Sequence, residues 1–152
     1  MSCVVALEGF PLTQQFVIKE LTIIFEGEDY QHFQFNCPTG LLFSPKDWGT
    51  IRYTQRFNGL ALVDDSFLPY EVIGYILNQI KDLRIYTAGH QAKNCLQQYL
   101  PNTEVIDMCK HFGFKYPLVL QESNCFVTHC SRYCSLSKAR TLKAALLIFQ
   151  VC

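Results

Sequence analysis

A short segment near the C-terminus concentrates side chains that bind soft metals. In the stretch SNCFVTHCSRYCSLSKAR, Cys125, His129 and Cys134 follow one another closely, and Cys130 offers a further thiol. Thiolate sulfur and imidazole nitrogen are favoured ligands of Zn²⁺, usually in tetrahedral sets of four that a carboxylate often completes. The segment therefore predicts a zinc site, although core thiols beside a surface histidine would have the same composition.

The overall composition is that of a globular domain with no bias toward a charged partner. The 152 residues are 49% hydrophobic and 14% aromatic, which is enough for one core, so we expect a single domain over residues 1–152. Lys+Arg and Asp+Glu both number 13, so the net charge gives no long-range attraction to nucleic acid or anionic membranes.

The N-terminal and hydropathy patterns favour an intracellular location. The first residues, MSCVVALEGF, lack the basic flank of a signal peptide, and no run of eighteen apolar residues occurs that could span a membrane. In a reducing compartment the eight cysteines are expected to be buried thiols or metal ligands rather than disulfides.

The elements that must position these side chains follow a β-β-β-α-β-α-β-α order. A continuous apolar run at 3–7 predicts a central strand buried on both faces, and alternation at 16–25 and 30–37 predicts two antiparallel neighbours. A short helix is expected within 46–57. The later elements are helices at 69–83, 90–99 and 137–149, and short strands at 84–87 and 104–108. The expected fold class is α+β (α/β), with a mixed central sheet flanked by helices.

Four stretches resemble the ribonuclease H-like fold in its DnaQ-type, DEDDh exonuclease branch. CVVALEGFPL is similar to the first exonuclease motif, and GLALVDDSFLPYEVIGYIL to the segment before the second. AGHQAKNCLQQYLPNTEVIDM resembles the second motif and SRYCSLSKARTLKAAL the third. The resemblance implies a three-stranded antiparallel meander followed by alternating helices and parallel strands.

Carried over residue by residue, the resemblance implies the loss of catalysis. The family's centre uses four carboxylates to hold two Mg²⁺ or Mn²⁺ ions about 4 Å apart. Those four positions fall, in chain order, on Ala6, Glu8, Cys95 and Lys138. The water-activating position falls on Tyr133 or Cys134. Because one carboxylate survives and a lysine would repel the cations, two-metal exonuclease activity is not expected.

The closest resemblance is to the Maelstrom domain, a ribonuclease H-like module of the germline piRNA pathway. In that fold Glu8 would lie beside the start of the last helix, and Glu, Cys, His and Cys in this chain order form the family's zinc set. The resemblance thus implies one structural Zn²⁺ held by Glu8, Cys125, His129 and Cys134, with Cys130 as an alternative thiolate. It assigns no residue to hydrolysis.

The C-terminal third is also locally basic and is the expected RNA-binding surface. Aromatic side chains at Tyr116 and Tyr133 could stack a base, and the basic side chains could hold a phosphate backbone. Those basic residues are Lys115, Arg132, Lys138, Arg140 and Lys143. A solvated helix face would have the same composition.

The resemblance implies a function in small-RNA silencing of transposons. Single-stranded RNA, protein partners of the silencing assembly, or both would bind, in cytoplasmic perinuclear granules, the nucleus or both. No small-molecule substrate and no membrane contact are expected. Two alternatives remain open: a weak, metal-independent RNA endonuclease, and a pure protein-interaction adaptor of viral or mobile-element origin.

Three further side chains are predicted to be structural. Cys95 has no basic cluster beside it in the sequence and is expected to be an inert buried thiol. Asp107 is expected to be a strand-end or capping carboxylate, and His90 a capping or core histidine.

Overall fold

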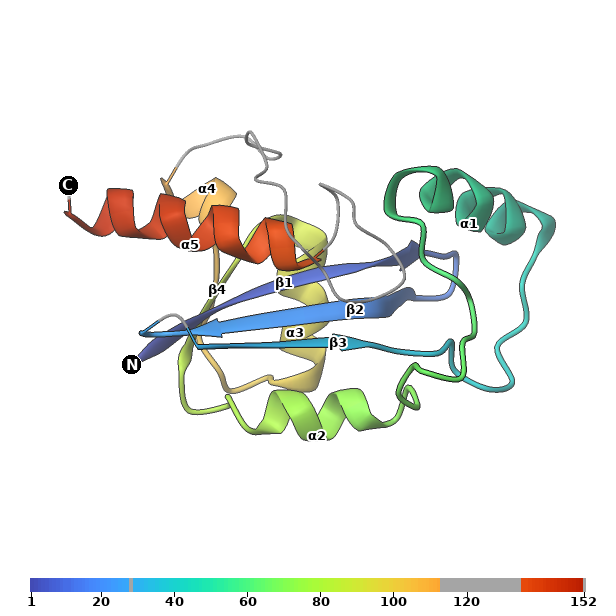
Figure 1. The fold of residues 1–152 in the computed structure, drawn as a ribbon, viewed down its shortest axis with the longest axis horizontal. Helices are drawn as coiled ribbons and strands as arrows, with labels where there is room; N and C mark the ends of the chain where they lie inside the picture. The colour runs from blue at the N-terminus through green and yellow to red at the C-terminus, as the bar shows by residue number, and fades with distance from the viewer. Residues whose placement is uncertain (28, 113–134, 152) are drawn as a thin grey trace.

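A mixed five-stranded β-sheet forms the centre of the protein (Figure 1). The computed structural model describes residues 1–27, 29–112 and 135–151. The strands are β1 (Ser2–Pro11), β2 (Phe16–Phe25), β3 (Tyr30–Gln34), β4 (Arg84–Thr87) and β5 (Val105–Asp107). β1, β2 and β3 pair antiparallel, β4 and β5 run parallel to β1, and the strand order is β3-β2-β1-β4-β5. The predicted α+β class with a mixed sheet is confirmed.

β1 lies at the middle of the sheet because both of its faces are apolar. Val5 and Leu7 pack on one side and Val4 and Ala6 on the other, and all four are buried. The strand predicted at 3–7 is therefore confirmed as buried on both faces, and it extends further in both directions than the apolar run.

A β-bulge interrupts the pairing of β1 with β2. Glu8 lies opposite Glu20 but Gly9 lies opposite Ile18, so Lys19 is the extra residue on β2. A Cβ atom on Gly9 would lie 1.9 Å from the carbonyl oxygen of Val17, so this close approach requires glycine. Strict alternation along 16–25 would place Val17 on the same face as Leu21 and Ile23. The bulge shifts the register, and Ile18 packs with those two residues instead.

Helices cover both faces of the sheet. α2 (Val72–Asn78) and α3 (His90–Tyr99) pack on one face, where Ile73, Leu77 and Leu96 belong to the same core cluster as the β1 side chains Val5 and Leu7. α5 (Ser135–Val151) covers the other face through a second cluster, with Ala139, Leu142, Ala145 and Leu146 against Val4 and Ala6. The short helix α4 (Met108–Phe112) follows β5 directly. Figure 1 shows α5 and α2 on opposite sides of the strands.

The remaining helix, α1 (Pro45–Asn58), lies at the end of the sheet where β1 ends (Figure 1). It packs through a third, small cluster in which Ile51 contacts Phe10 and Leu60. The helix predicted within 46–57 is thus confirmed with slightly wider ends. Within the described ranges, no helix combines the length and hydropathy needed to traverse a bilayer.

Candidate functional site

Glu8 and Lys138 form an ion pair between β1 and the first turn of α5. Their side chains are 13% and 19% exposed, and the Lys138 ammonium also donates to the carbonyl oxygen of Leu7 at 3.2 Å. The sequence placed Glu8 beside the start of the last helix, and the structure confirms that position. A partly desolvated carboxylate–ammonium pair of this kind is screened by salt much less than a surface pair.

A second carboxylate, Glu20, lies directly across from Glu8 in the β1–β2 register. Glu20 is fully buried and accepts hydrogen bonds from the backbone N–H of Ser135 and, at 3.0 Å, from Nε2 of Gln34. Ser135 is the first residue of α5, so Glu20 caps this helix from a neighbouring strand. A negative charge at a helix N-terminus is stabilised by the unpaired N–H groups and the helix dipole there.

Hydroxyl and imidazole groups extend this network across β2 and β3. Hydrogen bonds join the Thr22 hydroxyl to Nδ1 of His32 at 2.6 Å and to the Ser135 hydroxyl at 2.7 Å. Nε2 of His32 lies 3.9 Å from Oε2 of Glu20. We call the whole set the polar cluster; its members are Glu8, Glu20, Thr22, His32, Gln34, Ser135 and Lys138.

The two carboxylates of the polar cluster face groups that neutralise them. The ammonium of Lys138 compensates Glu8, and the N-terminus of α5 together with the Gln34 amide compensates Glu20. Over the described ranges, no three His, Cys, Asp or Glu side chains gather as a metal-binding group. The arrangement is a charge-compensated network that holds α5 on the sheet, in which the buried Oε1 of Gln34 has no hydrogen-bond partner within the described residues.

Most of the predicted zinc and RNA ligands fall outside the described residues. Cys125, His129 and Cys134 of the zinc set, the alternative Cys130, and the basic residues Lys115 and Arg132 all lie in 113–134. Glu8 is the described member of the zinc set, and its carboxylate is bound to Lys138. The zinc site stays a prediction.

The three described residues of the predicted RNA surface, Lys138, Arg140 and Lys143, are all partly buried. Lys138 is turned inward to Glu8. The guanidinium of Arg140 lies 5.5 Å from the centre of the Tyr30 ring, and Arg140 and Lys143 are both half-buried. The RNA-binding role of these residues stays a prediction.

The position that the resemblance assigns to a second-motif Asp lies away from the polar cluster. Cys95 is buried between α3 and the opposite face of the sheet, and burial raises the pKa of its thiol to about 11. Burial likewise raises the pKa of Cys3 to about 12. The prediction that Cys95 is buried is confirmed, and a raised pKa disfavours the reactive thiolate form.

The structure also shows the surroundings of Asp107 and His90, the two other side chains predicted to be structural. Asp107 accepts hydrogen bonds from the backbone N–H groups of Gly89 and Cys109, at 2.9 and 3.1 Å, which confirms its role as a strand-end cap. His90 is exposed in the first turn of α3, where Nε2 lies 2.9 Å from the side-chain nitrogen of Asn94. It is therefore not a core histidine.

Glu20, His32 and Ser135 were not predicted as members of a site. Their signal in the sequence is a polar pair at Glu20 and Thr22 within a largely apolar strand, matched by His32 and Gln34 at the same two-residue interval. Side chains two apart on one strand share a face, so polar pairs on two adjacent strands indicate a buried polar face.

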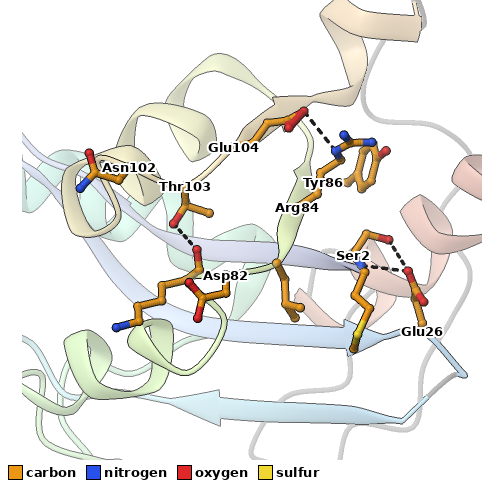
Figure 2. A pocket seen from close by; sticks show the side chains of 11 residues that line it. Ser2, Glu26, Asp82, Arg84, Tyr86, Asn102, Thr103 and Glu104 are labelled. Carbon is orange, nitrogen blue, oxygen red and sulfur yellow. Dashed lines mark hydrogen bonds and ion pairs between the residues drawn. The ribbon is translucent and has the colours of Figure 1, made fainter.

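An open hollow of about 610 Å³ lies at the other end of the sheet, where β1 and β4 begin (Figure 2). Its polar groups bind one another: Arg84 pairs with Glu104 at 3.1 Å, Glu26 accepts from Ser2, and the Thr103 hydroxyl donates to the carbonyl oxygen of Lys81. Its wall carries three acidic side chains, Glu26, Asp82 and Glu104, and two basic ones, Lys81 and Arg84. The hollow therefore has no convergent set of groups aimed at one ligand.

Comparison with protein-family models and with curated proteins finds no match for this sequence.

Proposed function

We propose that the protein is a catalytically degenerate ribonuclease H-like domain, closest to the Maelstrom domain, that binds single-stranded RNA, protein partners or both in small-RNA silencing. The Glu8–Lys138 ion pair is the observation that carries this proposal. The strand order, with an antiparallel meander followed by two strands parallel to β1, supports the fold assignment.

The positive charge of Lys138 supports the proposed loss of two-metal catalysis. An exonuclease of this type would place divalent cations against the first-strand carboxylates. Here the ammonium of Lys138 already binds Glu8, and Ala6 stands where the first Asp of the resemblance falls. A cation entering beside Glu8 would meet a like charge in a partly buried setting, where repulsion is much stronger than in water.

A metal-independent nuclease finds less support in the polar cluster. A general base must reach its substrate. The His32 side chain is 11% exposed and is hydrogen-bonded to Thr22, and Ser135 is fully buried. The cluster therefore offers no open base or nucleophile.

Labelled single-stranded RNA tests the proposed function. We expect the wild-type protein to bind the RNA in fluorescence anisotropy and to leave it intact with Mg²⁺, with Mn²⁺ and without metal. Cleavage that depends on added metal and disappears in Glu8→Gln would overturn the proposal. A co-purifying protein partner together with no RNA binding at low salt would favour the adaptor alternative.

The zinc site forms part of the same proposal. Two thiolates, an imidazole and a carboxylate are a donor set that zinc accepts, and zinc would stabilise the fold by joining β1 to the segment before α5. Glu8 would then have to serve both the metal and Lys138, because Oε1 is already bound to the ammonium.

Metal analysis of purified protein tests the zinc site. We expect one equivalent of zinc, lost in Cys134→Ser and retained in the control Cys109→Ser, whose thiol is half-buried on α4. Zinc far below one equivalent and unchanged by Cys134→Ser would refute the site. In that case the Glu8–Lys138 pair would hold α5 without a metal.

A further inference from the structure

α1 is a well-formed helix that buries very little of its own surface. Ile51 is its contact with the small cluster around Phe10 and Leu60. The ends are fixed by hydrogen bonds: Ser44 and Asp47 form a reciprocal capping box, and Gly59 ends the helix in a left-handed conformation with φ 66°. Local capping, rather than extensive packing, defines this helix.

The acidic side chain of α1 is turned inward. Asp47 is 2% exposed, and its carboxylate accepts from the backbone N–H of Thr13 at 2.9 Å and that of Ser44 at 3.1 Å. These hydrogen bonds lower the pKa of Asp47, so the carboxylate stays ionised while it anchors the turn after β1. No negative charge is left on the solvent side of α1.

The solvent side of α1 carries cations and aromatic rings. We call it the α1 outer face. At 3.6 residues per turn Trp48, Arg52 and Arg56 lie in one line along the helix, with Lys46 and Tyr53 beside them, over a length of about 15 Å. All five side chains are exposed, Trp48 by 42% and Tyr53 by 60%. Across the described ranges, no ion pair involves Lys46, Arg52 or Arg56.

This composition matches one class of ligand. Three unpaired cations on a protein of zero net charge give a local positive field whose natural counterpart is a polyanion. Exposed aromatic rings between those cations can stack on unpaired bases, which an acidic peptide does not have. Arginine also suits phosphate because its planar fork donates two parallel hydrogen bonds.

We propose that the α1 outer face binds single-stranded nucleic acid, with Arg52 and Arg56 on phosphates and Trp48 stacked on a base. This inference deepens the proposed function by naming the surface that takes the strand, in place of the C-terminal surface expected from the sequence. It rests on the proposed RNA binding but not on the loss of catalysis.

Salt-dependent binding of fluorescent oligonucleotides tests the inference. If three cations contact phosphates, the slope of log K against the logarithm of the salt concentration is about −2. Arg52→Gln/Arg56→Gln removes two of these contacts and would change the slope to about −0.7. Trp48→Ala would weaken binding roughly tenfold at every salt concentration, and Trp48→Phe would restore most of it. Oligo-uridine and oligo-thymidine probes distinguish RNA from DNA.

A matched control removes the same charge elsewhere. Lys81→Gln/Arg84→Gln lies at the hollow where β1 and β4 begin, and it should leave both slope and affinity unchanged. Circular dichroism checks that every variant is folded. Wild-type binding that survives the α1 changes but fails in Arg140→Gln/Lys143→Gln would overturn this inference and leave the proposed RNA binding intact.

Other outcomes separate the two proposals further. If the wild-type protein binds neither probe at low salt, or binds poly-glutamate instead, both the α1 inference and the RNA part of the proposed function are wrong. Metal-dependent RNA cleavage lost in Glu8→Gln would contradict the degenerate centre alone.

Discussion

The polar cluster beneath α5 and the α1 outer face both lie toward the end of β1, and they use charge in opposite ways. In the polar cluster the ammonium of Lys138 and the carboxylates of Glu8 and Glu20 are turned inward and compensated. On α1 the acidic group is turned inward and the cations point to solvent. A compensated buried network contributes to stability and register, whereas unpaired exposed cations contribute to binding. The comparison favours a structural role for the polar cluster and agrees with the binding role proposed for α1.

The largest expected effect is on the polar cluster. Glu20→Ala would leave the Ser135 N–H and the Gln34 amide without their acceptor in a buried site, and we expect a loss of about 3 kcal/mol in the free energy of unfolding. Urea denaturation measures it. Glu71→Ala, which removes an exposed carboxylate from the N-cap of α2 without removing a side-chain capping hydrogen bond, should cost less than about 1 kcal/mol. If Glu20→Ala lowered the free energy of unfolding as little as the control does, the polar cluster would not have the stabilising role that distinguishes it from the α1 outer face.

The second-largest effect on stability is expected for Lys19, the buried lysine at the bulge. The ammonium of Lys19 donates to the carbonyl oxygen of Leu62 at 2.6 Å and lies 4.9 Å from the centre of the Phe67 ring. Burial lowers its pKa from 10.5 to about 8. That difference corresponds to at most about 3 kcal/mol of destabilisation while Lys19 is protonated, so Lys19→Met should stabilise the protein at neutral pH by up to that amount.

The pH dependence of this effect has a definite sign. Between pH 8 and 10.5 the unfolded chain keeps the lysine proton that the folded chain releases, so wild-type stability rises relative to Lys19→Met. Urea midpoints of the two proteins should therefore converge as the pH rises through this window. If the difference between the two urea midpoints did not change with pH, the charge of buried Lys19 would not destabilise the folded protein.

A smaller effect is expected for the ion pair itself. In a double-mutant cycle of Glu8→Gln and Lys138→Met, we expect a coupling energy of about 1–2 kcal/mol, because both side chains are largely but not fully buried. Urea denaturation at low and high salt measures it. A coupling energy near zero would mean that the pair does not hold α5 to β1.

The smallest effect on stability is expected on α1. Arg52→Gln/Arg56→Gln touches exposed side chains outside any described ion pair, so the free energy of unfolding should change by less than about 0.5 kcal/mol. The same variant should weaken nucleic-acid binding. If its stability fell as much as that of Glu20→Ala, the α1 outer face would be structural and the contrast with the polar cluster would disappear.

Local patterns in the sequence predicted much of the fold. The apolar run at 3–7, the alternation at 16–25 and the helical period at 90–99 each gave the right element, since these signals lie within one segment. The bulge at Gly9 and Lys19 was not predicted, because one inserted residue leaves the apolar pattern of β2 almost unchanged. The start of α1 could have been placed from Ser44 and Asp47, whose types and spacing fit a capping box.

The candidate site was less predictable because its contacts span long separations in the chain. The hydrogen bond between Glu20 and Ser135 joins residues 115 positions apart, and no local pattern announces it. Glu8 was placed correctly through the family resemblance, but its pairing with Lys138 depends on where α5 begins. α5 begins at Ser135, two residues before the predicted start, which places Ser135 over Glu20.

A titration of Mn²⁺, followed by electron paramagnetic resonance, tests most directly whether Lys138 has replaced the metal. With the wild-type protein and Glu8→Gln compared at millimolar Mn²⁺, we predict no bound ion that depends on Glu8. Ala6→Asp/Lys138→Asp, which restores two carboxylates beside Glu8, should gain such a site. Mn²⁺ bound by the wild-type protein and lost in Glu8→Gln would contradict the account.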